Sequence, residues 1–165
     1  MKLILIGMKN CGKTTIGNLL AKKLNIDFFD LDIELEKVFK KKTGKKSTFQ
    51  EIFKQKGEIF FRSIETQTLK HLDNIFYSRE FILACGGGTL TTQENLKILI
   101  NMGLIIYLDV DKKINRKRIK DTRWLNKFNK LYDERKKVFI QAANLTIGIR
   151  DERPEDIVTR IIAQI

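Results

Sequence analysis

The chain has 165 residues, of which 42% are hydrophobic and 32% are charged, and it carries a net charge of +12. This length predicts a single domain, residues 1–165, that is large enough to bury a core, and the apolar content argues against disorder. No apolar stretch approaches the roughly 20 residues of a membrane span, and no signal-peptide pattern precedes the first predicted strand. We therefore expect a cytoplasmic protein with no membrane partner.

The excess of positive charge is compatible with a nucleic-acid partner. However, the lysines are spread along predicted helices, as at 40–42 and 45–46, and the aromatic residues offer no stacking platform. A solvated surface with an anion-binding site explains the charge better, so we expect no nucleic-acid partner. We also expect a monomer. The two cysteines, Cys11 and Cys85, lack the spacing of a zinc site and fit a reducing compartment.

Short apolar runs alternate with longer segments of helical periodicity along the chain. The predicted strands are Lys2–Ile6, Asp27–Phe29, Phe81–Ala84, Leu104–Leu108 and Leu145–Ile149. Apolar residues between 16 and 24 recur at helical spacing and predict a first helix with one buried face. This alternation is typical of a three-layer α/β domain, with a mainly parallel five-stranded sheet between helices and with ligands at the carboxyl ends of the strands.

Several residues mark predicted helix ends. The patterns S-x-x-Q at 47–50 and T-x-x-E at 91–94 match the capping box that opens a helix. Gly103 is placed where the C-terminus of a helix favours a left-handed residue. Pro154, the only proline, suits the first turn of a last helix.

The first predicted strand runs into Gly7-Met8-Lys9-Asn10-Cys11-Gly12-Lys13-Thr14, which matches the phosphate-loop pattern G-x-x-x-x-G-K-[ST] between a strand and a helix. Such a loop turns backbone N–H groups toward one concavity, and the following helix adds its positive N-terminal end. Lys13 can then reach the β- and γ-phosphates, and the Thr14 hydroxyl can ligate Mg²⁺. The alternative is an ordinary glycine turn. The residues expected to bind a nucleoside triphosphate are Asn10, Cys11, Gly12, Lys13, Thr14 and Thr15.

Two carboxylates, Asp30 and Asp32, follow the second predicted strand. Because residues two apart in an extended chain project to the same side, both are expected to face the triphosphate. One carboxylate near Mg²⁺ and one near an acceptor hydroxyl would supply a kinase with charge neutralisation and a general base. The alternative is that the two carboxylates cap the next helix.

Glu58, Arg62 and Glu65 are spaced i, i+4 and i+7, which places them on one face of a predicted helix. They could form a surface ion-pair ladder, or the carboxylates could hold the guanidinium toward an anionic substrate. The third predicted strand runs into Gly86-Gly87-Gly88, and three successive glycines are costly in backbone entropy. A close approach of the backbone to a ligand would explain that cost. This strand lacks the terminal Asp of a Walker B motif, which shifts the Mg²⁺ role to Asp30.

The phosphate loop, F-x-D-x-D, G-E-x-x-F-R-x-x-E and G-G-G occur in this order, and together they resemble shikimate kinase over nearly the whole chain. The resemblance implies phosphorylation of the 3-hydroxyl of shikimate, a step toward chorismate, with ATP and Mg²⁺. It also implies a P-loop kinase fold of the nucleoside-monophosphate-kinase type, with a parallel five-stranded sheet in the order 2-3-1-4-5.

Motif positions within the resemblance imply roles for individual residues. Asp32 would contact the reacting hydroxyl as base, and Asp30 would support Mg²⁺ through water. The substrate-binding set is Asp32, Arg62, Gly86, Gly87 and Arg135, in which the two arginines would hold the carboxylate of shikimate. The catalytic set is Asp32, Lys13 and Arg123.

The expected lid, about residues 121–130, departs from the family. The usual element is an arginine on a helix, a flexible stretch and then R-P-L. Here Arg118 matches the adenine-side arginine, with Arg116 as a competing choice, and Arg123-Trp124-Leu125 matches the lid motif after a shorter spacer. Trp124 stands where proline is usual. We expect this polar segment to move and to bring Arg123 onto the triphosphate.

Two other functions stay open at this point. One is a kinase for another small hydroxy acid, such as gluconate, on the same fold. The other is a catalytically silent nucleotide-binding regulator or a nucleic-acid partner. The two arginines and the triple glycine favour a cyclic carboxylate. The intact set Lys13, Thr14, Asp30, Asp32 and Arg123 argues against an inactive protein.

Overall fold

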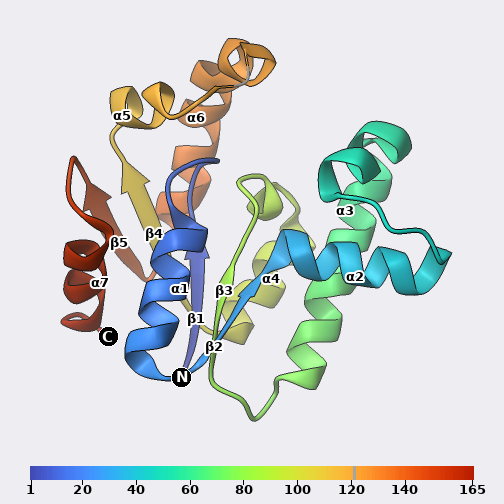
Figure 1. Cartoon of the computed structure of the whole chain (residues 1–165), viewed down its shortest axis with the longest axis horizontal. Coiled ribbons are helices and arrows are strands. Elements are labelled where there is room, and N and C mark those ends of the chain that lie inside the picture. The colour runs from blue at the N-terminus through green and yellow to red at the C-terminus, as the bar shows by residue number, and fades with distance from the viewer. Residues whose placement is uncertain (121) are drawn as a thin grey trace.

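The computed structural model describes residues 1–120 and 122–165, with the backbone alone at position 123. Strands and helices alternate along the chain (Figure 1). The strands are β1 (Lys2–Ile6), β2 (Asp27–Asp30), β3 (Phe81–Ala84), β4 (Leu104–Val110) and β5 (Leu145–Ile149). The helices are α1 (Lys13–Leu24), α2 (Leu31–Thr43), α3 (Phe49–Ile75), α4 (Gln93–Met102), α5 (Lys112–Lys117), α6 (Thr122–Ala142) and α7 (Pro154–Ile162), with a short 3-10 turn η1 (Thr89–Thr91). No helix in this described part is long and apolar enough to cross a membrane.

The strands form one parallel sheet in the order β2-β3-β1-β4-β5, which confirms the predicted topology. β1 is central, so Leu3 pairs with Ile82 of β3 on one side and with Leu104 of β4 on the other. Because all strands run in the same direction, their carboxyl ends and the loops that follow them gather at one edge of the sheet.

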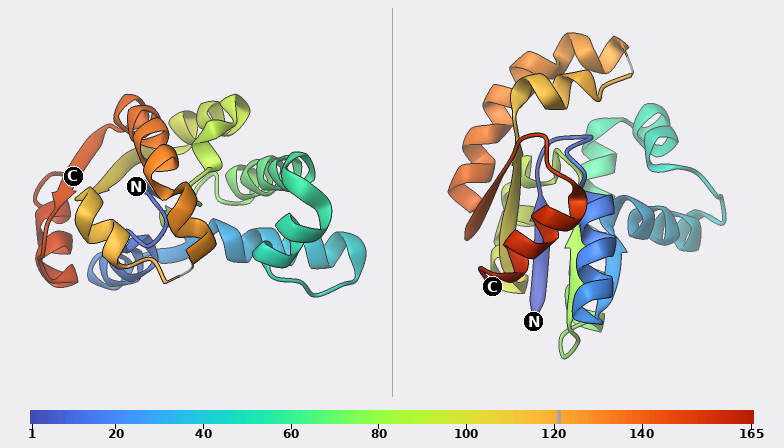
Figure 2. Two further views of the ribbon diagram at one scale, coloured as in Figure 1. Left: turned by 90° about the horizontal axis from the view of Figure 1, so that it is seen from above. Right: turned by 60° about the vertical axis from the view of Figure 1, so that its left-hand side comes forward.

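The two faces of the sheet support separate cores, because successive side chains of a strand point to opposite faces. Leu3 and Leu5 pack with residues of α1 and α7 on one face. Ile4 and Ile6 pack with residues of α3, α4 and α6 on the other. The right-hand view in Figure 2 shows α1 and α7 in front of the strands. Both faces are therefore covered, which explains the continuous apolar run of β1.

Helices α2 and α3 project beyond the edge of the sheet that β2 forms (Figure 1). They pack on each other through a third, smaller apolar cluster. Its buried members are Leu35, Phe39, Ile52, Phe61 and Ile64. α3 is interrupted at Gly57, which has φ 80° and ψ 174° and joins two helical segments at a kink. The second segment starts at once with Glu58, so the kink sets the direction in which the following turns face the sheet.

The structure corrects three predicted helix ends. The capping box of α3 lies at Thr48 and Glu51, one residue later than predicted, because the Glu carboxylate accepts from the Thr48 N–H at 2.8 Å and is a stronger acceptor than the neutral Gln50. No side chain caps α4: the Thr91 hydroxyl donates to the Gly88 carbonyl instead. Gly103 is extended rather than left-handed, and a Cβ there would lie 2.5 Å from the Lys2 carbonyl oxygen.

Candidate active site

The loop between β1 and α1 has the conformation that the phosphate-loop pattern predicts. Asn10 and Gly12 adopt left-handed φ values of 64° and 101°, and α1 begins directly afterwards at Lys13. The first turn of α1 contains no acidic residue. Its positive N-terminal end is therefore open to an anion. The Cys11 side chain is buried, so this residue can meet a ligand only through its backbone.

Lys13 lies across its own loop. Its Nζ donates to the carbonyl oxygens of Gly7 at 3.0 Å and Met8 at 2.9 Å, and it lies 3.5 Å from the Cys11 sulfur. These contacts hold the ammonium at the mouth of the concavity. Thr14 and Thr15 are exposed beside it on the wall of the same cavity.

Asp30 and Asp32 meet the phosphate loop, although not as an extended pair. Asp30 is the N-cap of α2 and accepts from the Asp32 N–H at 3.1 Å, while its other oxygen accepts from the Thr14 hydroxyl at 2.9 Å. Asp32 lies in the first turn of α2 rather than on a strand. The expectation that both project from extended chain was thus wrong in its reason, but both carboxylates do line the cavity.

The Asp32 carboxyl is electrostatically unusual. Its burial, followed by the negative charges of Asp30 and Glu65, raises the pKa of Asp32 to about 6, against the opposing charge of Lys13. A base works best when its pKa lies near the operating pH. The site therefore holds a carboxylate that can both accept and release a proton near neutrality.

Arg62 is held by carboxylates, as the helix spacing predicted. Its Nη1 donates to Glu65 at 2.9 Å, and its Nε lies 3.7 Å from Glu58. The two partners differ in burial, because the Glu65 side chain is 1% exposed and that of Glu58 is 67% exposed. The ion-pair ladder is therefore a buried clamp at one end and a surface contact at the other.

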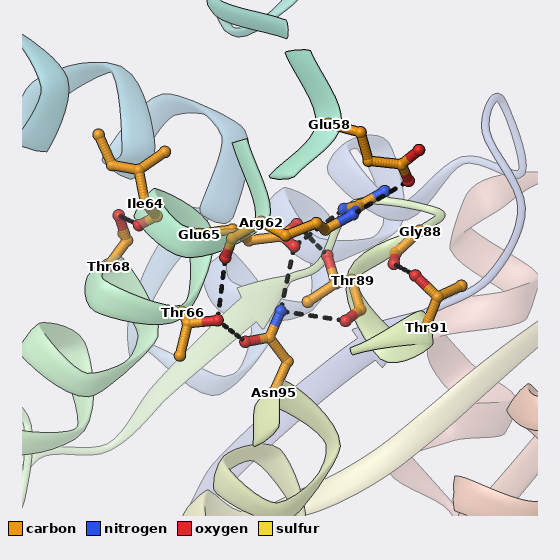
Figure 3. Close-up of polar contacts among 10 residues, drawn as sticks. All are labelled: Glu58, Arg62, Ile64, Glu65, Thr66, Thr68, Gly88, Thr89, Thr91 and Asn95. Carbon is orange, nitrogen blue, oxygen red and sulfur yellow. Dashed lines mark hydrogen bonds and ion pairs between the residues drawn. The ribbon is translucent and has the colours of Figure 1, made fainter. Parts of the chain in front are cut away.

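A buried polar network behind Arg62 escaped the sequence analysis (Figure 3). Glu65 accepts from the Thr89 hydroxyl at 2.7 Å and from Asn95 Nδ2 at 3.0 Å. Asn95 also donates to the Thr89 carbonyl at 3.1 Å and accepts from the Thr66 hydroxyl at 2.6 Å. The network joins α3, η1 and α4. The available signal was a lone Asn on the apolar stripe of α4, in phase with Leu99 and Met102.

The glycine turn lies between this network and the phosphate loop. A Cβ on Gly86 would lie 3.3 Å from Asp32, one on Gly87 would lie 3.1 Å from the Lys9 backbone nitrogen, and one on Gly88 would lie 2.4 Å from Nη2 of Arg62. None of these three glycines has a positive φ. The space beside them is therefore what limits a side chain here, most severely at Gly88, and their backbone forms one wall of the cavity.

Arg135 reaches the same place from α6. A Cβ on Gly88 would lie 3.2 Å from its Nη2, so the terminal nitrogens of Arg62 and Arg135 converge on one point. Burial and the nearby positive charge of Arg62 lower the pKa of Arg135. Two guanidinium groups held this close form a site for an anion, and their planar geometry suits a carboxylate.

The described residues of the predicted lid, 122–130, form the start of α6. Phe128 among them is fully buried. Asp121 and the side chain of Arg123 lie outside the described residues, so the role of Arg123 stays a prediction. Arg118 is exposed at the end of α5 and lies outside the described lining of the main cavity. Its carbonyl accepts from the Asn10 side chain at 3.3 Å.

One further contact near the lid was missed by sequence reasoning. Asn115 of α5 is fully buried, and its Nδ2 donates to the Lys9 carbonyl at 3.1 Å. Together with the Asn10 contact to Arg118, it fastens the phosphate loop to the segment that leads into α6. Arg116, the competing adenine-side choice, lines a shallow hollow between α5 and Leu125.

These groups share one cavity of about 1100 Å³ at the carboxyl edge of the sheet. At one end lie the phosphate loop, Thr14 and Asp30, and at the other lie the two arginines and the glycine turn, with Asp32 between them. The arrangement can hold a phosphorylated ligand at one end and a carboxylate-bearing ligand at the other.

Comparisons with known proteins agree with this geometry. The shikimate kinase family model matches residues 9–165. The chain is 31% identical to the shikimate kinase of Aquifex aeolicus (strain VF5) over 170 residues, which cover 98% of this chain and 94% of that protein. It is 37% identical to the shikimate kinase of Rippkaea orientalis over 174 residues, which cover 100% of this chain and 88% of that protein.

Solved structures give the same result. The shikimate kinase of Acinetobacter baumannii in complex with shikimate superposes with a TM-score of 0.84 at 28% identity, covering 98% of this chain and 90% of that one. The shikimate kinase of Aquifex aeolicus superposes with a TM-score of 0.81 at 30% identity, and the match covers 99% of this chain and 95% of that one. The chain therefore belongs to the shikimate kinase family.

Proposed function

We propose that the chain transfers the γ-phosphoryl group of ATP to the 3-hydroxyl of shikimate, giving shikimate 3-phosphate and ADP on the way to aromatic amino acids. One observation carries the proposal: the phosphate loop, the Asp32 carboxylate and the pair Arg62 and Arg135 open into a single cavity. The Acinetobacter baumannii relative in complex with shikimate supports the choice of acid.

In this assignment the two arginines bind the carboxylate of the acid. Their terminal nitrogens converge beside Gly88, and Glu65 fixes Arg62 from behind at 2.9 Å. The glycine turn supports the ring of the acid, and a side chain at Gly88 would displace Arg62. The acid is thus oriented with a hydroxyl toward Asp32, which lies on the phosphate-loop side of the turn.

Asp32 accepts the proton of the attacking hydroxyl. The acceptor oxygen forms a bond to the γ-phosphorus, the bond from that phosphorus to the β–γ bridging oxygen breaks, and ADP leaves with the electron pair. Lys13, which contacts the loop carbonyls of Gly7 and Met8, is placed to turn toward the β- and γ-phosphates. The backbone N–H groups of the loop hold the charge of the transferring group.

The residues present fit Mg²⁺. The Thr14 hydroxyl and the Asp30 carboxylate lie 2.9 Å apart beside the loop, and Mg²⁺ is commonly held by one or two protein oxygens together with phosphates and waters. Among the described residues no group of three His, Cys, Asp or Glu side chains forms a complete metal cage. Bound with ATP, the ion would neutralise phosphate charge.

The deciding experiment is ADP release by the purified chain with ATP and a panel of acids: shikimate, gluconate and a shikimate analogue without the carboxylate. We expect turnover with shikimate alone. Turnover with gluconate instead would replace the acid assignment, and ATP binding without ADP release from any acid would favour a silent regulator. Gel filtration and cell fractionation test the expected monomer and cytoplasmic location.

A further inference from the structure

Trp124 touches both halves of the active site. It lies near the start of α6 and lines the cavity together with Lys127, Leu131 and Arg135 of the same helix. The guanidinium carbon of Arg135 lies 5.7 Å from the centre of its ring, and Nζ of Lys9, in the phosphate loop, lies 5.6 Å from it. Both distances are within the reach of a cation–π interaction. Trp124 is also half-buried and packs against the core beneath α6.

The two arginines of the acid site are held in different ways. Arg62 has two carboxylate partners, Glu65 and Glu58. The described part of the chain offers Arg135 no carboxylate within ion-pair distance, although the buried Nε atoms of both arginines lack a hydrogen-bond partner there. The contact that does orient the Arg135 guanidinium is the indole of Trp124.

This difference has a chemical consequence. A carboxylate that held Arg135 would compete with an anionic substrate for the same N–H groups. An aromatic face attracts the cation and fixes its plane without supplying a competing anion. The terminal nitrogens of Arg135 are thus kept beside Gly88 with their donors available.

We propose that Trp124 is a positioning residue for Arg135: its ring orients the guanidinium for the carboxylate of the acid substrate, and the same ring, through Lys9, contacts the phosphate loop. The inference rests on the proposed function in that the acid is taken to be shikimate. It predicts that filling the acid site changes the surroundings of the indole.

The chain is suited to a direct test, because Trp124 is its only tryptophan. Titration of the wild-type protein with shikimate, without nucleotide, should give a saturable change in tryptophan emission. The analogue that lacks the carboxylate should give none. In Arg135→Lys the emission change should require a higher shikimate concentration, since lysine lacks the planar fork.

Steady-state kinetics distinguish a role of Trp124 in positioning Arg135 from a role in stabilising the fold. Trp124→Leu should raise the KM for shikimate about 2- to 30-fold, the range of a cation–π contact, with a much smaller change in the KM for ATP. Trp124→Phe keeps a weaker aromatic face, so its KM for shikimate should lie between those of the wild type and Trp124→Leu. In an Arg135→Lys background, Trp124→Leu should have little further effect on the KM for shikimate.

Tyr77→Leu is the matched control, because that exposed ring also contacts a lysine, Lys2 at 5.6 Å, but is not part of the cavity lining. It should leave both KM values unchanged. If Trp124→Leu does not fold, the KM values of Trp124→Phe and the emission titration of the wild type test the positioning role of Trp124.

Two outcomes would overturn the inference: an unchanged KM for shikimate in both Trp124 variants of an active enzyme, or an emission change of equal size with the analogue. If the wild type releases no ADP with shikimate but its emission still responds only to the carboxylate-bearing acid, the proposed reaction fails and the role of Trp124 is supported.

Discussion

Thr89 Oγ1 donates a 2.7 Å hydrogen bond to Glu65 Oε1, and this contact joins the glycine turn to the helix that carries Arg62. The second oxygen of the same carboxylate accepts from Arg62 and from Asn95. A single buried carboxylate therefore sets the position of an arginine and of the backbone beside it. Because hydrogen bonds in a buried network rigidify the groups that they join, the two walls of the acid site are expected to move together.

Glu65→Gln should weaken acid binding. The neutral amide loses the charge-assisted bond to Arg62, which is worth about 1.5–3 kcal/mol, so the KM for shikimate should rise on the order of 10-fold while the KM for ATP changes little. Steady-state kinetics with each substrate varied gives both values. Glu58→Gln is the control, since its contact with Arg62 is longer and exposed, and should change the KM for shikimate less than about threefold. An equal rise in the KM for shikimate in the two variants would contradict the role of Glu65 in holding Arg62.

Gly88→Ala should impair acid binding by a steric clash, without removing any polar group. The new Cβ would lie 2.4 Å from Nη2 of Arg62, so the guanidinium must shift. A shift of this kind in a substrate-positioning group can cost about 10²-fold, which would be seen in kcat/KM for shikimate. Gly148→Ala is the matched control, because a Cβ there meets nothing within 4 Å. Normal kcat/KM in Gly88→Ala would show that Arg62 does not need this space.

Asp32→Asn should lower the activity of the enzyme and raise its thermal stability at neutral pH. Loss of the base should lower kcat by about 10²–10⁴-fold. Because the folded chain raises the pKa of Asp32 from 3.8 to about 6, the ionised carboxylate destabilises the fold increasingly as pH rises from about 4 to 6. Asn removes that cost, on the order of 1–3 kcal/mol, so the Tm should increase at pH 7 but not at pH 4.

The same titration should govern the rate of the wild-type enzyme. The rate constant kcat/KM for shikimate should increase with pH up to about 6, where Asp32 loses its proton. Thermal unfolding at both pH values and a pH–rate profile provide the measurements. A Tm that falls at pH 7 in Asp32→Asn, or a flat profile between pH 4 and 7, would contradict the assignment.

Thr14→Val should weaken the response to Mg²⁺. The Thr14 hydroxyl donates to Asp30 at 2.9 Å and is a hard oxygen at the loop. Its loss should raise the Mg²⁺ concentration for half-maximal activity by roughly 10-fold or more, as for other groups that support a metal site. Thr159→Val, on α7 far from the loop, is the control. An unchanged Mg²⁺ titration would remove Thr14 from the metal site.

Arg123→Ala tests the lid register that the sequence predicts. An arginine that meets the transferring phosphoryl group can be worth about 10³–10⁵ in kcat, so kcat should fall steeply while ADP affinity changes little. ADP and shikimate together should also protect the Lys- and Arg-rich range 121–130 from trypsin, because a closed lid excludes solvent. Normal kcat in Arg123→Ala, with a loss in Arg116→Ala or Arg118→Ala, would show that the register is wrong.

The sequence by itself determined those features that depend on short stretches of chain. Periodicity located all five strands, with errors of one or two residues at the ends of β2 and β4. The phosphate loop could be found because its residues are contiguous, and Asn10 adopts the left-handed conformation that such a loop needs. The clamp from Glu58 to Glu65 could be found because helix geometry fixes which residues share a face.

Tertiary structure decided which distant groups meet. Glu65 and Asn95 are 30 residues apart, and Asn115 and Lys9 are 106 residues apart, so no local pattern relates them. It also placed Asp32, Lys9 and Arg62 beside the three glycines, so the space for a side chain there is small and is least at Gly88. The pKa of Asp32 depends on burial, which exists only once α2 packs on the sheet. Helix geometry and strand periodicity are set by the local backbone, whereas burial, charge and contact at this site are set by packing.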